Sequence, residues 1–176
     1  MIGIDLSPEE FFQLMPHKEP MLMIDGVIEA DPELDSGTAF YIPGRRPMAG
    51  LNPDGSLPVH IVLEVMAQGC AAILGICRLL RNEPPMDKGL LLSVRGFKTC
   101  CTGSLPQGKK ILITVKRELL ENGFAVLTAE ARFSAPPEEK GDYAPELLSV
   151  ARGRFSVWSS GAETDGGDGE TGLQRI

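Results

Sequence analysis

The most regular hydrophobic pattern in the chain is a long apolar run from Pro58 to Arg81. It is interrupted at four-residue intervals by His60, Glu64 and Gln68, and most of its other residues are aliphatic, small or sulfur-bearing. At roughly 100° per residue, a step of four residues turns by only about 40°, so the three polar side chains form one stripe on a helix face. We predict a buried helix here, whose polar stripe must be satisfied or used chemically, because an unpaired buried polar group costs about 1–3 kcal/mol.

The remainder of the chain reads as one short helix and several strands. Ser7, followed by Pro8-Glu9-Glu10, predicts a capped helix that ends by Met15, before Pro16. Strands are predicted over residues 21–30 (bent or bulged at Gly26), 38–42, 89–101, 109–120, 124–134 and 147–158. Residues 43–57 read as a loop and 136–145 as a polar hairpin loop, and Glu121-Asn122-Gly123 predicts a tight hairpin.

This order of elements predicts the fold class. A single hydrophobic helix beside about six antiparallel strands indicates an α+β domain whose sheet wraps the helix. We expect one domain over residues 1–158. Residues 159–176 consist mainly of Gly, Asp, Glu and Thr, which cannot bury apolar area, so we expect a disordered acidic tail.

Charge and cysteine content restrict the partners and the compartment. The net charge is −7, of which the tail contributes −3, and this acidic balance argues against nucleic-acid binding. The four cysteines have no metal-site spacing, and we expect them to be reduced packing residues in a cytoplasmic protein. The amino terminus lacks the regions of a signal peptide, and we expect no membrane-spanning segment because the long helix carries His60, Glu64 and Gln68.

Three motifs, in order, resemble those of the β-hydroxyacyl-[acyl carrier protein] dehydratases. They are Leu14-Met-Pro-His-Lys-Glu-Pro-Met-Leu-Met-Ile-Asp25, Val62-Leu-Glu-Val-Met-Ala-Gln68, and Arg95-Gly-Phe-Lys98 followed by Pro106-Gln-Gly108. Together they extend over nearly the whole predicted domain. The Met-Ala-Gln version of the helix resembles the dehydratase-like branch associated with aryl-polyene and related pathways.

The resemblance implies a hotdog fold, in which a curved antiparallel sheet wraps one long helix. It also implies a homodimer with a joined sheet and active sites at the dimer interface. Glu64 matches the family's catalytic acid and Gln68 its neighbouring glutamine. The family's catalytic histidine, fourteen residues before the acid, has no counterpart, because that position is Gly50 and the similar Tyr41-Ile-Pro-Gly44 begins with tyrosine.

The residues suggest how a 3-hydroxyacyl thioester could be dehydrated. The reaction needs a base for the α-hydrogen and an acid for the departing hydroxyl group. Glu64 in an apolar tunnel would favour its protonated form and act as the acid. His60, one turn earlier, could hydrogen-bond it or act as the base, and Gln68 could hold the carboxyl group or a water. No cofactor or metal is expected.

Other residues are candidates for contact with the substrate, and each has a structural alternative. His17 could simply form a turn after Pro16, and Met66 could be core filler instead of part of an acyl pocket. Tyr41 is a further candidate because of its place in the Tyr-Ile-Pro-Gly segment. Arg95 and Lys98 could meet the phosphate of a pantetheine arm or an acidic carrier protein, or be ordinary surface charges. Likewise His60 could be solvated, and Glu64 could be a buried carboxylate bound to backbone amides.

These observations leave three functions open. The first is a 3-hydroxyacyl-thioester dehydratase-like lyase acting on acyl carrier protein or CoA substrates of fatty-acid or polyketide-type metabolism. The second is a non-catalytic hotdog subunit that binds an acyl thioester or pairs with an active paralogue. The third is a hotdog acyl thioesterase, in which a similarly placed carboxylate activates water.

Overall fold

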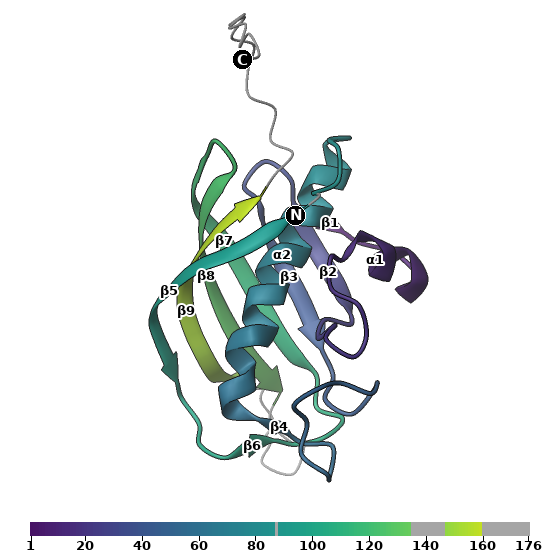
Figure 1. Cartoon of the computed structure of the whole chain (residues 1–176), viewed down its shortest axis with the longest axis vertical. Helices are drawn as coiled ribbons and strands as arrows, with labels where there is room; N and C mark the ends of the chain where they lie inside the picture. The colour runs from purple at the N-terminus through teal and green to yellow at the C-terminus, as the bar shows by residue number, and fades with distance from the viewer. Residues whose placement is uncertain (87, 135–146, 160–176) are drawn as a thin grey trace, which may run out of the picture.

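A curved antiparallel sheet wraps around one long helix in the computed structural model, which describes residues 1–86, 88–134 and 147–159 (Figure 1). Seven strands follow the order β1-β2-β3-β7-β8-β9-β5, and each pair of neighbours in this sheet is antiparallel. Their bounds are β1 Ile2–Gly3, β2 Gly26–Asp31, β3 Ser36–Tyr41, β5 Gly89–Thr99, β7 Ile111–Glu121, β8 Phe124–Ser134 and β9 Leu147–Ser159. The two-residue strands β4 Leu57–Pro58 and β6 Ser104–Leu105 form a second small sheet. The expected hotdog architecture is therefore confirmed.

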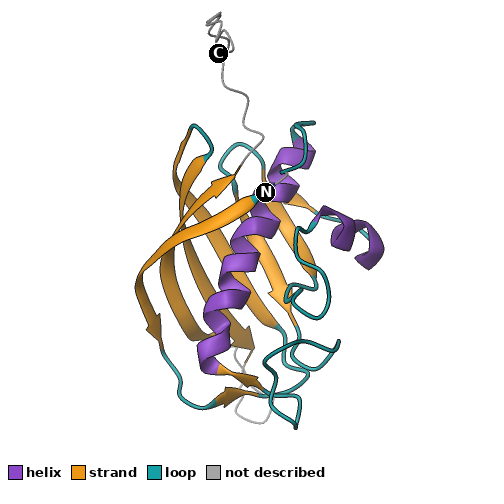
Figure 2. Ribbon diagram, viewed as in Figure 1, coloured by secondary structure: helices purple, strands orange, loops and turns teal. Residues whose placement is uncertain are grey.

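The apolar run forms the central helix, as predicted. A 3₁₀ turn, η1 (Val59–Ile61), leads directly into α2 (Val62–Leu80). The helix crosses the concave side of the sheet (Figure 2) and contributes fully buried side chains such as Val62, Met66 and Ile73 to the core. Burying one such side chain stabilises the fold by about 1.5–3 kcal/mol, so this helix organises the hydrophobic core.

The composition of the helix corrects one expectation. An 18-residue window of the 22 residues Val59–Leu80 has a mean hydropathy of 1.8, so by length and composition alone this segment could span a membrane. The expectation that no segment is apolar enough was therefore wrong, because three polar side chains do not offset so many aliphatic ones. Of that window, 56% is buried inside the protein, where the sheet covers it.

The short helix α1 (Pro8–Leu14) begins as its sequence predicts. The Ser7 hydroxyl accepts a hydrogen bond from the Glu10 N–H, and the Glu10 carboxylate accepts one from the Ser7 N–H. This reciprocal pair is a capping box, which satisfies two otherwise unpaired donors at the helix start.

The segment from Met21 to Asp25 was wrongly predicted as the beginning of a strand. In the structure β2 begins at Gly26, and the register shift falls between Val27 and Glu29 instead of at the glycine. The side chains of Gln68 and Arg46 form hydrogen bonds with backbone groups of this segment, in place of a neighbouring strand. Leu22, Met23 and Ile24 are buried, but they are held as a loop.

Turn chemistry was predicted more successfully. Asn122 and Gly123 have φ angles of 48° and 78°, which matches the tight hairpin predicted between β7 and β8. The strands β1, β4 and β6, each two residues long, were not predicted. The predicted hairpin loop over 136–145 and nearly all of the predicted tail lie outside the described residues.

Candidate active site

The polar stripe of the central helix divides into an exposed part and an enclosed part. The side chain of His60 is exposed, Glu64 is half-buried and Gln68 is buried. His60 belongs to the 3₁₀ turn, which has about three residues per turn, so it does not continue the α-helical face of the other two. The structure therefore brings Glu64 and Gln68 together and leaves His60 in solvent.

Gln68 uses its whole amide group. Its Oε1 accepts a hydrogen bond from the Met23 N–H at 2.8 Å, and its Nε2 donates to the Met21 carbonyl at 2.8 Å. The second Nε2 hydrogen goes to Glu64 Oε1 at 2.9 Å. One buried amide thus binds the loop before β2 to the helix and contacts the carboxyl group as well.

This network fixes the chemistry of the Glu64 carboxyl group. The Met23 N–H can only donate and the Met21 carbonyl can only accept, so the orientation of the Gln68 amide is determined. Glu64 Oε1 must therefore be an acceptor, and any proton that Glu64 carries resides on Oε2. The glutamine leaves Oε2 as the oxygen available for proton transfer.

A small cavity of about 110 Å³ joins Glu64 and Gln68 to His17. The His17 Nδ1 atom is buried and has no hydrogen-bond partner among the described residues. The remaining lining is mostly apolar and includes residues of the helix, of the loop after it and of strands β5 and β9. These residues include Leu74, Met86, Leu90, Leu91 and Trp158. A histidine and a carboxylic acid thus share one largely apolar space.

The loop that carries His17 is also held from its far side. The Asp25 carboxylate accepts hydrogen bonds from the Ile42 N–H at 2.7 Å and from Arg46 Nε at 2.9 Å. Arg46 also donates to the Ile24 carbonyl at 3.0 Å and lies over the Phe12 ring, 4.6 Å from its centroid. The end of the loop at Met21–Asp25 is therefore held from both sides by hydrogen bonds, and Arg46 also contacts Phe12 before the loop, which positions His17 between them.

Three other predicted site residues lie away from this cavity. Tyr41 is buried in the core, and burial, together with the nearby Asp25 carboxylate, raises the pKa of its phenol to about 12. Met66 is fully buried in the core. Lys98 is exposed on β5 and belongs to no described cavity.

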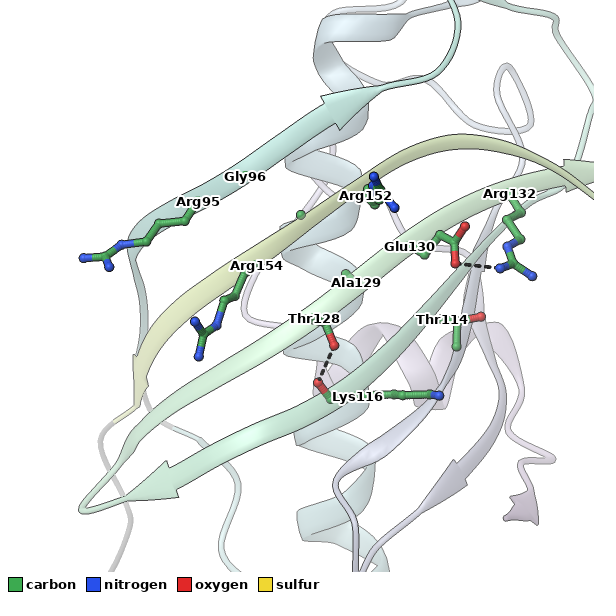
Figure 3. A pocket seen from close by; sticks show the side chains of 11 residues that line it. Arg95, Gly96, Thr114, Lys116, Thr128, Ala129, Glu130, Arg132, Arg152 and Arg154 are labelled. Atoms are coloured by element: carbon green, nitrogen blue, oxygen red, sulfur yellow. Dashed lines mark hydrogen bonds and ion pairs between the residues drawn. The ribbon is translucent and has the colours of Figure 1, made fainter.

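Arg95 is also exposed on β5, and it borders a hollow on the outer face of the sheet (Figure 3). The cavity residues of β5 and β9 were not predicted, because the exposed leucines of β5 carry no local sign of a site. The Pro16-His17 turn was the one signal that could have identified the cavity from its other side.

Comparisons with known proteins identify the family and the fold. The family described as ApeP-like (ApeP dehydratase) matches residues 9–151. A structure of the dehydratase heterocomplex ApeI:P from Xenorhabdus doucetiae is similar, with a TM-score of 0.70, 22% identity, and coverage of 90% of this chain and 94% of that one. No curated protein matches the chain.

More distant structures share the fold alone. The protein smu.793 from Streptococcus mutans, bound to acetyl CoA, has a TM-score of 0.53 at 10% identity, covering 84% of this chain and 96% of that one. A 4-hydroxybenzoyl CoA thioesterase mutant bound to 4-hydroxybenzoyl CoA has a TM-score of 0.51 at 12% identity, covering 71% and 84%.

Proposed function

Because the chain belongs to the ApeP-like dehydratase family, we propose that it dehydrates 3-hydroxyacyl thioesters carried by acyl carrier protein or CoA. The observation that carries this proposal is the shared cavity of Glu64, Gln68 and His17. It supplies one group that can donate a proton and one that can accept a proton, which are the two groups that the reaction requires.

In the proposed reaction His17 is the base and Glu64 the acid. A ring nitrogen of His17 accepts the proton from C2, the C2–C3 double bond forms, and the C3–O bond breaks. Glu64 Oε2 gives its proton to the departing hydroxyl group, which leaves as water and yields a 2-enoyl thioester. Gln68 holds Oε1 as an acceptor throughout, so the proton that is transferred is the one on Oε2.

The assignment of the base depends on exposure. The chain contains two histidines, and only His17 lines the cavity with Glu64. His60 is exposed, so we assign the base to His17 and leave His60 without a catalytic role. Tyr41 and Met66, which lie in the core, are not part of the proposed site.

The two histidines provide a matched test. We expect His17→Asn to lower the rate of 2-enoyl thioester formation by about 10²-fold or more, as for loss of a general base. Glu64→Gln should lower it at least as much. His60→Asn, the same substitution at an exposed position, should leave the rate within about twofold. Enoyl product is followed by mass spectrometry, with circular dichroism as the check on folding.

The opposite pattern would refute the assignment: loss of activity in His60→Asn with His17→Asn still active. Release of free thiol without enoyl product would show a thioesterase instead.

A non-catalytic subunit is the second candidate function. It is favoured by the missing counterpart of the family histidine at Gly50 and by the similar structure, which is a heterocomplex. In that case the purified chain is inactive, and activity appears only after mixing with a second hotdog dehydratase chain. Glu64→Gln in this chain then tells whether its cavity contributes to the combined activity.

We further propose that the chain forms a dimer through β5. This strand is at the edge of the sheet, pairs only with β9 among the described strands, and exposes Leu90, Leu91 and Leu92. An exposed apolar edge strand is a template for pairing with another chain. Since Leu90 and Leu91 also line the cavity, a partner across β5 would cover the site. We expect this assembly in the cytoplasm.

A further inference from the structure

Two rows of polar side chains, mostly basic at the β5 edge, cross the outer face of the sheet. In the first row Arg95 pairs with Arg154, Arg154 with Thr128, and Thr128 with Lys116. The second contains the pairs Lys98–Arg152, Arg152–Glu130 and Glu130–Thr114. Figure 3 shows the central helix behind these strands, on the side opposite to the labelled side chains.

These rows place like charges directly opposite one another. Arg95 faces Arg154, and Lys98 faces Arg152, across the same pair of strands. Like charges in this position destabilise a sheet, and here they occur in a chain with a net charge of −7. The repulsion between these cations lowers the stability of the sheet, and their positive charge is opposite in sign to the net charge of the chain. A role beyond folding is therefore indicated.

Only part of this charge is neutralised within the described residues. Of the five cations in the rows, Arg154 forms an ion pair with Glu118 at 2.6 Å. Glu130 of the second row pairs at 2.7 Å with Arg132, which lies outside the rows. None of the other four cations makes an ion pair within the described part of the chain; these are Arg95, Lys98, Lys116 and Arg152. Arg152 faces Glu130, and after the hydrogen bond from Arg132 its charge contributes to the lowered pKa of that carboxyl group, whereas Arg95, Lys98 and Lys116 remain available to an anionic partner.

The shape of the surface indicates an extended partner. An open hollow of about 650 Å³ lies among these strands, with small residues Gly96, Ala129 and Gly153 in its lining. The cationic side chains around it point in different directions instead of converging on one point (Figure 3). A single phosphate group would need convergent donors, whereas carboxylates spread over a protein surface match spread arginines.

We propose that this face docks the acidic surface of the acyl carrier protein that presents the thioester, an inference that rests on the proposed function. Residues of the rows and residues that line the cavity both lie on strands β5 and β9. Arg95 is four residues along β5 from Leu91, and Arg154 is three residues along β9 from Val157, which is about 10–13 Å at 3.3 Å per residue. A carrier on these rows is held next to the sheet edge where the cavity lies.

Binding is tested by fluorescence anisotropy with a labelled acidic holo acyl carrier protein and the full chain. We expect the affinity to fall as NaCl is raised, and Arg95→Gln/Arg152→Gln to weaken it by about tenfold. The matched control is Lys109→Gln/Lys110→Gln, which removes the same charge outside the rows and should bind like the wild type. The row variant should melt close to the wild type, because it removes the Arg95–Arg154 and Lys98–Arg152 repulsion together with the Arg152–Glu130 attraction.

The outcomes separate docking from catalysis. Equal weakening in both double variants, or binding that is insensitive to Arg95→Gln/Arg152→Gln, overturns the proposal. Displacement of the labelled carrier by free CoA that also depends on Arg95 and Arg152 overturns it in favour of a phosphate site. If the carrier binds through the rows but no enoyl product forms, docking stands and the proposed activity fails. If a CoA thioester is dehydrated while the carrier does not bind, the proposed activity stands and the docking proposal fails.

Discussion

At the scale of the residue, Gln68 shows how one side chain can serve both folding and chemistry. Its amide satisfies a backbone N–H and a backbone carbonyl of the loop before β2, and its remaining hydrogen orients Glu64. A buried polar network of this kind is stable only when every member is paired. The glutamine therefore explains why residues 21–25 are not a strand and why Oε2 of Glu64 is the oxygen assigned to proton transfer in the proposed reaction.

Gln68→Leu should consequently be costly. It leaves the buried Met23 N–H without a partner, at about 1–3 kcal/mol, and removes the part-buried hydrogen bond to the Met21 carbonyl, at about 1 kcal/mol. We therefore expect the free energy of unfolding to fall by about 2–4 kcal/mol. Urea denaturation measures the change. Gln13→Leu, the same substitution at an exposed helix position, is the control and should stay within about 0.5 kcal/mol. Equal effects of the two substitutions would show that the network contributes nothing.

At the scale of the element, the central helix lies close to the sheet at one glycine. A Cβ atom on Gly69 would lie 2.8 Å from Ile113 Cγ2 and 3.3 Å from its Cβ, and Ile113 is fully buried on β7. A branched side chain so close to its own backbone cannot move away cheaply. Gly69 therefore sets the distance between α2 and β7.

Two glycines of the same helix test this argument. Gly69→Ala should lower the free energy of unfolding by about 1–3 kcal/mol through overpacking. Gly75→Ala should raise it by up to about 1 kcal/mol, since the nearest atom is Met86 Cε at 3.9 Å and alanine favours the helix. Chemical denaturation of the two variants should therefore show changes of opposite sign. A stabilising Gly69→Ala would mean that the helix is free to shift.

At the scale of the whole molecule, edge strand β5 connects the proposed dimer interface with the proposed active site. Its leucines are exposed in the single chain, and two of them line the cavity of Glu64. A helix wrapped by a sheet leaves this side of the cavity uncovered, and in the proposed dimer the second chain would complete the enclosure. Assembly and activity are accordingly expected to be lost together.

Leu92 is the position at which to test this coupling, because it is exposed on β5 and does not line the cavity. We expect Leu92→Lys to weaken the dimer by at least about tenfold, since a lysine on an edge strand opposes pairing. Sedimentation velocity at several protein concentrations measures the equilibrium. Leu120→Lys, on an exposed end of β7, should leave the dimer intact. A monomeric wild type, or a Leu92→Lys dimer as tight as the wild type, would contradict the interface.

The sequence by itself determined the features that depend on local geometry. The period of the apolar run placed the central helix, Ser7 and Glu10 placed the start of α1, and Asn122-Gly123 placed a hairpin. The contact of Glu64 with Gln68 also followed from spacing, because side chains one turn apart on an α-helix are neighbours.

Only the tertiary structure decided which distant residues meet. His17 reaches the cavity because Gln68 and Arg46 hold its loop, and both lie far along the chain from it. The like charges of β5 and β9 face each other because pairing register, which no local pattern encodes, aligns strands that begin more than fifty residues apart. Local backbone geometry depends on neighbouring residues and can be read from them. The site and the docking face depend on packing between segments that are remote in the chain.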